Sequence, residues 1–148
     1  MSTKSLKQPT DCTCVHTVLA MITNTSVDYV IDWLSNSSAV GAEDQIIFLA
    51  HHGIYLATYV QPHQDGTYLA LTENEVLNVD FPIAKHPAII TVESERFEGR
   101  LHVIYWDGFR VHDPSPAVTE QRTLESYKVV EYWPIMMTAQ RLSQILGR

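Results

Sequence analysis

The segment from residue 101 to residue 113, LHVIYWDGFRVHD, constrains the fold most, because two strand-like runs flank Asp107-Gly108. Asp-Gly between alternating apolar residues is a strong signal for a two-residue β-hairpin loop. With that loop, counting back along both strands places His102 opposite Asp113. Directly opposed residues share one face of a sheet, with Cβ atoms about 4.5–5.5 Å apart. We therefore expect an antiparallel hairpin with a histidine–aspartate pair at its open end.

Further strands are expected around this hairpin in the second half of the chain. Runs rich in β-branched and aromatic residues lie at 54–60, 87–92 and 127–133, the last ending at Pro134. Turn formers fill residues 61–67. Residues 72–79 (TENEVLNV) carry a capping-box pattern, which predicts a short helix there.

The first half of the chain has helical patterning instead. Helices are expected over 14–23, with Asp11 or Thr13 as cap, over 27–35, capped by Ser26, and over 42–52, ending before Gly53. A last helix is expected over 138–146. Helices followed by antiparallel strands predict an α+β fold with N-terminal helices packed on an antiparallel sheet. No repeat or linker is visible, so residues 1–148 are expected to form one domain.

Composition excludes several classes of protein. The 148 residues are 45% hydrophobic and 18% charged, as in globular proteins. A net charge of -7 without clustered Lys and Arg argues against nucleic-acid binding. No secretory signal is present, and no run approaches the roughly 18 apolar residues of a membrane span. The expected location is the cytoplasm, and export by a signal-less route stays open.

The two cysteines, Cys12 and Cys14, stand two residues apart at the start of an apolar helix. A disulfide between them is disfavoured by geometry, and a structural zinc site needs four ligands, usually with Cys-x-x-Cys spacing. Cys14 would occupy the first helical turn, where the helix dipole and free N–H groups stabilise a thiolate. His16, about 200° further around the helix, points away from it. Cys14 is thus the candidate nucleophile, although two inert core thiols stay an alternative.

A histidine held by an aspartate can serve such a thiol as base. The aspartate fixes the imidazole tautomer and stabilises its protonated form. The competing interpretation is structural: His102 as an ordinary strand residue and Asp113 as the start of the Asp-Pro turn. A metal site of His51, His63 and His86 has no supporting ligand spacing. We expect neither a metal nor a cofactor.

Three blocks of sequence carry a resemblance to a known family. Gln8 precedes Cys14 by six residues and an apolar helix (VLAMI) follows; HPAIITV, LHVIYWDG and VHDPSP come later in the same order. The pattern, over roughly residues 6 to 116, resembles the papain-like cysteine peptidase domains that cleave bacteriocin leaders after a double glycine. The resemblance implies a papain-like fold with Cys14 as nucleophile and His102 as general base and acid. It also implies that Asp113 orients His102 and that Gln8 donates to the oxyanion beside the Cys14 N–H.

This chain departs from the family pattern at Val15 and His16, where the family has glycine and a small residue. No transporter region accompanies the motifs, which suits a free-standing processing enzyme, a host-directed effector, a toxin or a phage accessory protein. The leading hypothesis is a cysteine hydrolase, a peptidase acting on a peptide or protein substrate. The alternatives are a deamidase or other acyl transferase with the same groups, a binding module whose site has lapsed, and a thiol redox protein using Cys12 and Cys14.

Overall fold

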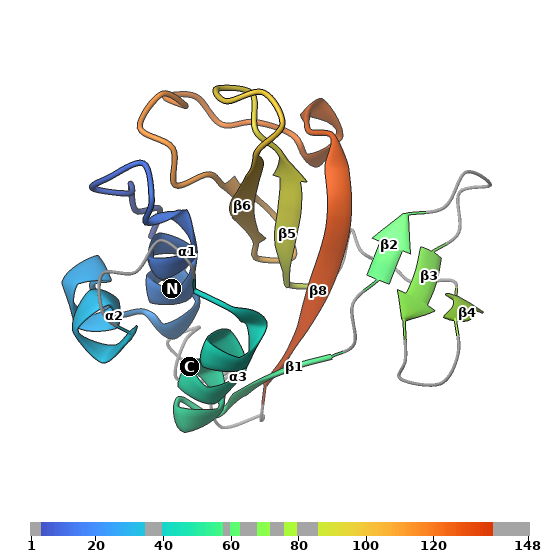
Figure 1. Cartoon of the computed structure of the whole chain (residues 1–148), viewed down its shortest axis with the longest axis horizontal. Helices are drawn as coiled ribbons and strands as arrows, with labels where there is room; N and C mark the ends of the chain where they lie inside the picture. The colour runs from blue at the N-terminus through green and yellow to red at the C-terminus, as the bar shows by residue number, and fades with distance from the viewer. Residues whose placement is uncertain are drawn as a thin grey trace.

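The computed structural model describes residues 4–34, 40–57, 60–62, 68–71, 76–79 and 86–137. Three helices come first: α1 (Cys14–Thr23), α2 (Val27–Leu34) and α3 (Ala42–His51). In Figure 1 the helices lie to the left of the strands β5, β6 and β8. Strands β2 to β4 lie to the right, where they continue the sheet beyond β8. The predicted α+β architecture, helices packed on an antiparallel sheet, is confirmed.

All strand pairs in the described residues are antiparallel. The strands are β1 (Ile54–Leu56), β2 (Val60–Pro62), β3 (Tyr68–Leu71), β4 (Val76–Val79), β5 (Ala88–Glu93), β6 (Leu101–Trp106), β7 (Val111–His112) and β8 (Val129–Met137). Their order in the sheet is β4-β3-β2-β8-β5-β6-β7, and β1 pairs with the far end of β8. Leu124–Ser126 adds a turn of 3-10 helix before β8. The centre of the sheet is therefore β8-β5-β6, and β6 carries His102.

Helix α1 has the predicted bounds and is almost entirely buried. It ends at Asn24, whose φ of 55° is the left-handed conformation that commonly closes a helix. The predicted side-chain caps at its start are wrong, since neither Asp11 nor Thr13 caps the first turn. The Thr13 hydroxyl instead donates a hydrogen bond to the Thr10 carbonyl at 3.1 Å. The first turn of α1 is thus left without a side-chain cap.

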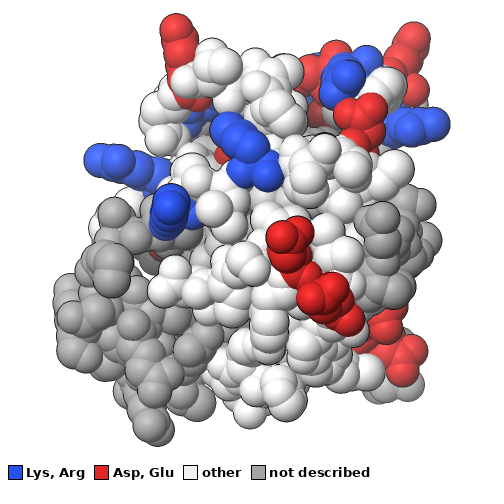
Figure 2. Space-filling model, turned by 90° about the vertical axis from the view of Figure 1, so that its left-hand side faces the viewer, with Lys and Arg blue, Asp and Glu red and all other residues white. Residues whose placement is uncertain are grey.

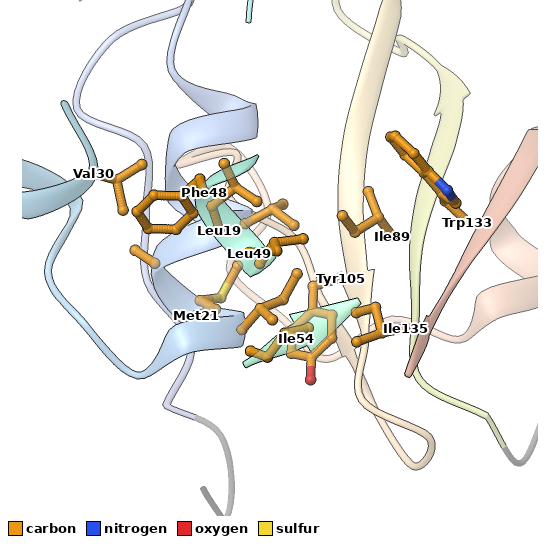
Figure 3. Packing of buried hydrophobic residues seen from close by; sticks show 13 residues of the cluster. Leu19, Met21, Val30, Phe48, Leu49, Ile54, Ile89, Tyr105, Trp133 and Ile135 are labelled. Carbon is orange, nitrogen blue, oxygen red and sulfur yellow. The ribbon is translucent and has the colours of Figure 1, made fainter. Parts of the chain in front are cut away.

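The core joins α1 to the sheet. Leu19 of α1, Phe48 of α3 and Ile54 of β1 are fully buried, and they pack with Ile89 of β5 and Tyr105 of β6 (Figure 3). Burial of such side chains stabilises the fold by about 1.5–3 kcal/mol each. This packing fixes α1, and with it Cys14, against β6.

The other two helices end near their predicted bounds. Ser26 caps α2 as predicted, because its Oγ accepts a hydrogen bond from the N–H of Tyr29 at 3.1 Å. Gly53 follows α3 with a φ of 75°, a conformation that favours glycine and lets the chain turn into β1.

The hairpin between β6 and β7 forms at the predicted place, but the predicted register is wrong by two residues. Tyr105 pairs with His112, so four residues, 107–110, form the loop in place of two. The Asp107 carboxylate holds this longer loop, because its Oδ1 accepts hydrogen bonds from two backbone N–H groups inside it, at 2.7 and 2.8 Å. Gly108 has a φ of 98°, which the turn requires.

His102 and Asp113 nevertheless meet. A shift of two residues leaves every side chain on the same face of the sheet, because side chains alternate with a period of two. Extending the observed register puts Asp113 diagonally across from His102, just past the end of β7, and diagonal neighbours remain within reach of long side chains. The predicted contact is confirmed, with 2.7 Å between His102 Nε2 and Asp113 Oδ1.

Three other expectations need correction. The predicted strand 54–60 is interrupted, since β1 ends at Leu56 and β2 begins at Val60. The short helix predicted over 72–79 is wrong, because residues 76–79 form β4 and pair with β3. Pairing with a neighbouring strand overrides the local capping signal there. The helix predicted over 138–146 and most of the turn at 61–67 lie outside the described residues.

The last strand does not end at Pro134 but continues to Met137. The Pro134 carbonyl accepts a hydrogen bond from the N–H of Ala57 at 2.9 Å, and its missing N–H lies on the same side of the strand. That side is where β1 has ended at Leu56, so no regular strand pair loses a donor. The proline is tolerated there, and β8 runs through it.

Candidate active site

Cys14 is the first residue of α1 and is half-buried. The helical hydrogen bonds begin with the N–H of Thr17, which donates to Thr13 O at 3.0 Å. The N–H groups of the first turn therefore have no carbonyl of the helix to donate to, and they lie at the positive end of the helix dipole. Cys14 thus stands at a helix N-terminus among the N–H groups of the first turn.

His102 stands on β6. Its Nε2 is 2.7 Å from Asp113 Oδ1, and Cys14 lines the same cavity and is among the groups that raise the pKa of the imidazole. Since Asp113 occupies Nε2, Nδ1 is the ring nitrogen open to a further partner. The structure thus joins the predicted imidazole and carboxylate by a hydrogen bond and places the predicted thiol on the wall of the same cavity.

The pKa of His102 is raised from 6.5 to about 9. Burial acts in the opposite direction, because it disfavours the charged imidazolium. The hydrogen bond with Asp113 and then the interaction with Cys14 outweigh burial, together with the negative charges of both partners. A pKa of about 9 favours the protonated imidazolium form of His102 at neutral pH.

Asp113 is buried yet ionised. Its Oδ1 accepts hydrogen bonds from His102 and from the N–H of Ser115 (2.9 Å), and its Oδ2 accepts one from the Tyr127 hydroxyl (2.7 Å). Burial alone would raise the pKa of Asp113, but these hydrogen bonds hold the pKa below its usual value. The carboxylate is thus available as a fixed negative charge behind His102.

Gln8 lines the same cavity as Cys14. Its backbone N–H donates to Pro114 O at 2.7 Å, which ties the N-terminal segment to the loop that carries Asp113. The side chain is buried, and its Nε2 donates to Thr10 O at 2.9 Å. An amide NH₂ carries two hydrogens, so one donor remains after the bond to Thr10.

These four residues line a single open groove of about 850 Å³. Its walls are the N-terminal segment around Cys14, the β5–β6 loop at residues 94–100, and the segment at residues 113–122. Cys12 also lines it and is exposed. Val15 packs against the core and His16 is fully buried, so neither residue narrows the groove.

Ion pairs join the groove walls. Arg96 of the β5–β6 loop contacts Asp11 at 2.7 Å, and Arg122 makes two hydrogen bonds to Glu95, at 2.6 and 2.9 Å. On the face that carries α2, basic side chains stand in separate groups among uncharged and acidic ones (Figure 2). This face offers no continuous basic track for a phosphate backbone among the residues that the structure describes.

No pattern in the sequence pointed to Tyr127 as a site residue. It stands at the start of a predicted strand among other aromatic residues, and no spacing links it to Asp113. Only the path of the chain from β7 back to β8 brings its hydroxyl to the carboxylate. Cross-strand counting could not find it, because Tyr127 lies outside the hairpin.

Among the histidines that the structure describes, His102 alone lines this groove. His86 Nε2 is bonded to Ile135 O at 3.1 Å, and His52 contacts Tyr29 at 2.9 Å. His63 lies outside the described residues. Within the described ranges, no three His, Cys, Asp or Glu side chains gather closely enough to hold a metal ion, and no helix is long and apolar enough to cross a membrane.

No protein-family model and no curated protein matches this sequence. Among solved structures, it matches a double-glycine motif protease from an AMS/PCAT transporter, whose crystal structure was determined in complex with the leader peptide. The match covers 93% of each chain, with a TM-score of 0.60 and 14% sequence identity. This chain has a papain-like peptidase fold. The likeness concerns the fold, and it agrees with the resemblance that the sequence motifs carry.

Proposed function

We propose that this chain is a cysteine hydrolase that cleaves amide bonds in a peptide or protein substrate. Cys14 is the nucleophile, His102 the general base and acid, and Asp113 the residue that orients His102. Gln8 and the Cys14 N–H stabilise the oxyanion. The observation that carries the proposal is the 2.7 Å contact between His102 and Asp113 on the wall of an open groove that Cys14 also lines.

The first step is attack of the Cys14 thiolate on the scissile carbonyl carbon. The carbonyl oxygen becomes negatively charged as the C–S bond forms, and it accepts hydrogen bonds from Gln8 Nε2 and the Cys14 N–H. Loss of one such donor slows acyl transfer by about 10²–10³. Gln8 keeps a second N–H for this role while the first stays on Thr10.

The second step is collapse of this intermediate. The His102 imidazolium gives its Nδ1 proton to the leaving amine, the C–N bond breaks, and an acyl-enzyme thioester remains. Neutral His102 then takes a proton from a water molecule that attacks the thioester. The acid product leaves, and the thiolate–imidazolium pair is restored.

Several features support a peptide substrate. The groove is open and has the size of typical ligand sites, about 300–1,000 Å³. The structural neighbour was solved with a leader peptide bound. Val15 is partly buried against the core, His16 is fully buried, and neither lines the groove. Because these departures from the family pattern leave the half-buried thiol on the groove wall, they favour a working site over a lapsed one.

Deamidation of a protein glutamine would use the same groups, so the test must distinguish the products. We would incubate the protein with a peptide library and with candidate proteins and read intact masses. Cleavage produces two fragments, whereas deamidation produces one chain with a small gain in mass. Hydrolysis by wild type that vanishes in Cys14→Ala and His102→Ala supports the proposal.

The matched control is Cys12→Ser, which changes the neighbouring thiol in the same groove. Activity should survive this change. Loss of activity in Cys12→Ser as well as in Cys14→Ala would favour the thiol redox alternative. Binding of a peptide that stays intact in both wild type and Cys14→Ala would favour a binding module.

A further inference from the structure

The Asp113 carboxylate has a different hydrogen-bond partner on each oxygen. Oδ1 faces His102 and the Ser115 N–H, and Oδ2 accepts the Tyr127 hydroxyl at 2.7 Å. A carboxylate held at one oxygen can rotate about its Cβ–Cγ bond. The bond at Oδ2 removes that freedom, and it keeps Oδ1 directed at His102 Nε2.

Tyr127 is itself held in place. Its side chain is buried in the apolar cluster that also contains Ile90, Ile104 and Tyr132. Arg122 lies over its ring, with 4.3 Å between the guanidinium carbon and the ring centroid. Arg122 in turn pairs with Glu95, which lines the groove. The ring is therefore enclosed by apolar packing and by a cation held from the groove wall.

The hydroxyl can act only as a donor to Asp113. Burial, and next the hydrogen bond with the Asp113 carboxylate, raise the pKa of Tyr127 well above its usual value. Tyr127 thus stays a neutral phenol over the whole working range of pH. An ionised carboxylate has no proton to offer, so the direction of the bond is fixed.

We propose that Tyr127 is a positioning residue for the Asp113–His102 pair, and that its hydroxyl keeps Asp113 ionised and turned toward His102. The inference rests on the proposed function, and it assigns a role to a residue outside the sequence motifs. Tyr127 also lines the groove, and its role in the proposed reaction is exerted through Asp113.

The test is Tyr127→Phe, which removes the hydroxyl and keeps the ring that Arg122 covers. The readout is the rate at which iodoacetamide alkylates the Cys14 thiolate, followed by peptide mass mapping from about pH 4 to pH 9. Cys12, exposed in the same molecule, provides the internal reference. Tyr132→Phe, a buried tyrosine of the same apolar cluster, is the matched control.

We expect Tyr127→Phe to lower the alkylation rate of Cys14 by about 5- to 10-fold, since hydrogen bonds to charged groups are stronger than neutral ones. The loss of rate at acid pH should also begin at a higher pH. Without the hydroxyl the pKa of Asp113 rises, so the imidazolium loses its partner sooner as the pH falls. Tyr132→Phe should change neither quantity.

Two results would overturn the inference. One is an alkylation profile of Tyr127→Phe equal to that of wild type. The other is a full additional loss when Tyr127→Phe is combined with Asp113→Asn, because a residue that acts through Asp113 has nothing left to position. If wild-type Cys14 reacts no faster than Cys12, the proposed function itself fails, which is a distinct outcome.

Discussion

Replacing Asp113 by asparagine should lower the pKa of the His102 imidazole by at least about 1 pH unit. A pKa raised from 6.5 to about 9 corresponds to roughly 3 kcal/mol in favour of the protonated form. Both the hydrogen bond with Asp113 and the charge of its carboxylate raise this pKa, and asparagine removes the charge. Burial, which opposes protonation, remains in the variant.

The assay is an NMR titration of the imidazole Cε1–H resonance of His102, assigned with His102→Gln. The matched control is Asp107→Asn. It removes the carboxylate that lies 2.7 Å from Nε2 of a different histidine, His112. The control should leave the pKa of His102 near 9. A pKa of His102 that is the same in Asp113→Asn and in wild type would refute the reasoning, because the imidazolium would then owe its stability to something other than this carboxylate.

Stability gives a second readout of the same change. The folded-state pKa of His102 is above its usual value, so its interactions stabilise the fold fully below about pH 6.5. That stabilisation is lost as the pH rises through about 9. The difference in unfolding free energy between wild type and Asp113→Asn should therefore shrink between neutral and alkaline pH.

Three further predictions concern the rest of the fold. Asp107→Asn should lower the free energy of unfolding by about 1.5–3 kcal/mol at neutral pH, because the Asp107 carboxylate makes a hydrogen bond with buried His112. The other ring nitrogen of His112 is already hydrogen-bonded to the Ser5 hydroxyl at 2.5 Å. The pKa of Asp107 lies below its usual value, so the difference in unfolding free energy between wild type and Asp107→Asn should disappear as acid protonates the wild-type carboxylate. Urea unfolding of both proteins at several pH values measures this difference. Leu19→Ala should cost about 2–5 kcal/mol in urea unfolding with an unchanged m-value, because Leu19 is fully buried; a cost under 1 kcal/mol would contradict the packing. Arg96→Gln should change stability by less than about 1 kcal/mol, because Arg96 and Asp11 are both more than half exposed; a larger loss that salt does not reduce would contradict this.

The sequence was sufficient for the elements with strong local signals. Helix α1 could be predicted because its apolar run fills the core, and Asn24 offers the left-handed end that closes it. The His102–Asp113 contact could be predicted from the hairpin, because side-chain faces repeat with a period of two and a shift of two residues preserves them. The placement of Cys14 in the first turn of a buried helix followed from the same apolar pattern.

What the sequence could not supply depends on competition between groups. The side chain of Asp107 bonds two N–H groups of its own loop, and this lengthens the loop beyond the two residues that Asp-Gly favours. The segment at 76–79 pairs with β3 in spite of its helical cap signal. The hydrogen bond from Tyr127 to Asp113 joins residues of two separate segments, and no local sequence pattern around either residue predicts it.

The central claim is that His102 activates the Cys14 thiol, and the most direct test compares the two thiols of one molecule. Iodoacetamide labelling at about pH 6, with peptide mapping, gives separate rates for Cys14 and for exposed Cys12. We predict faster labelling of Cys14 in wild type and loss of that advantage in His102→Gln. Equal rates for the two cysteines, or an advantage of Cys14 that survives His102→Gln, would contradict the account.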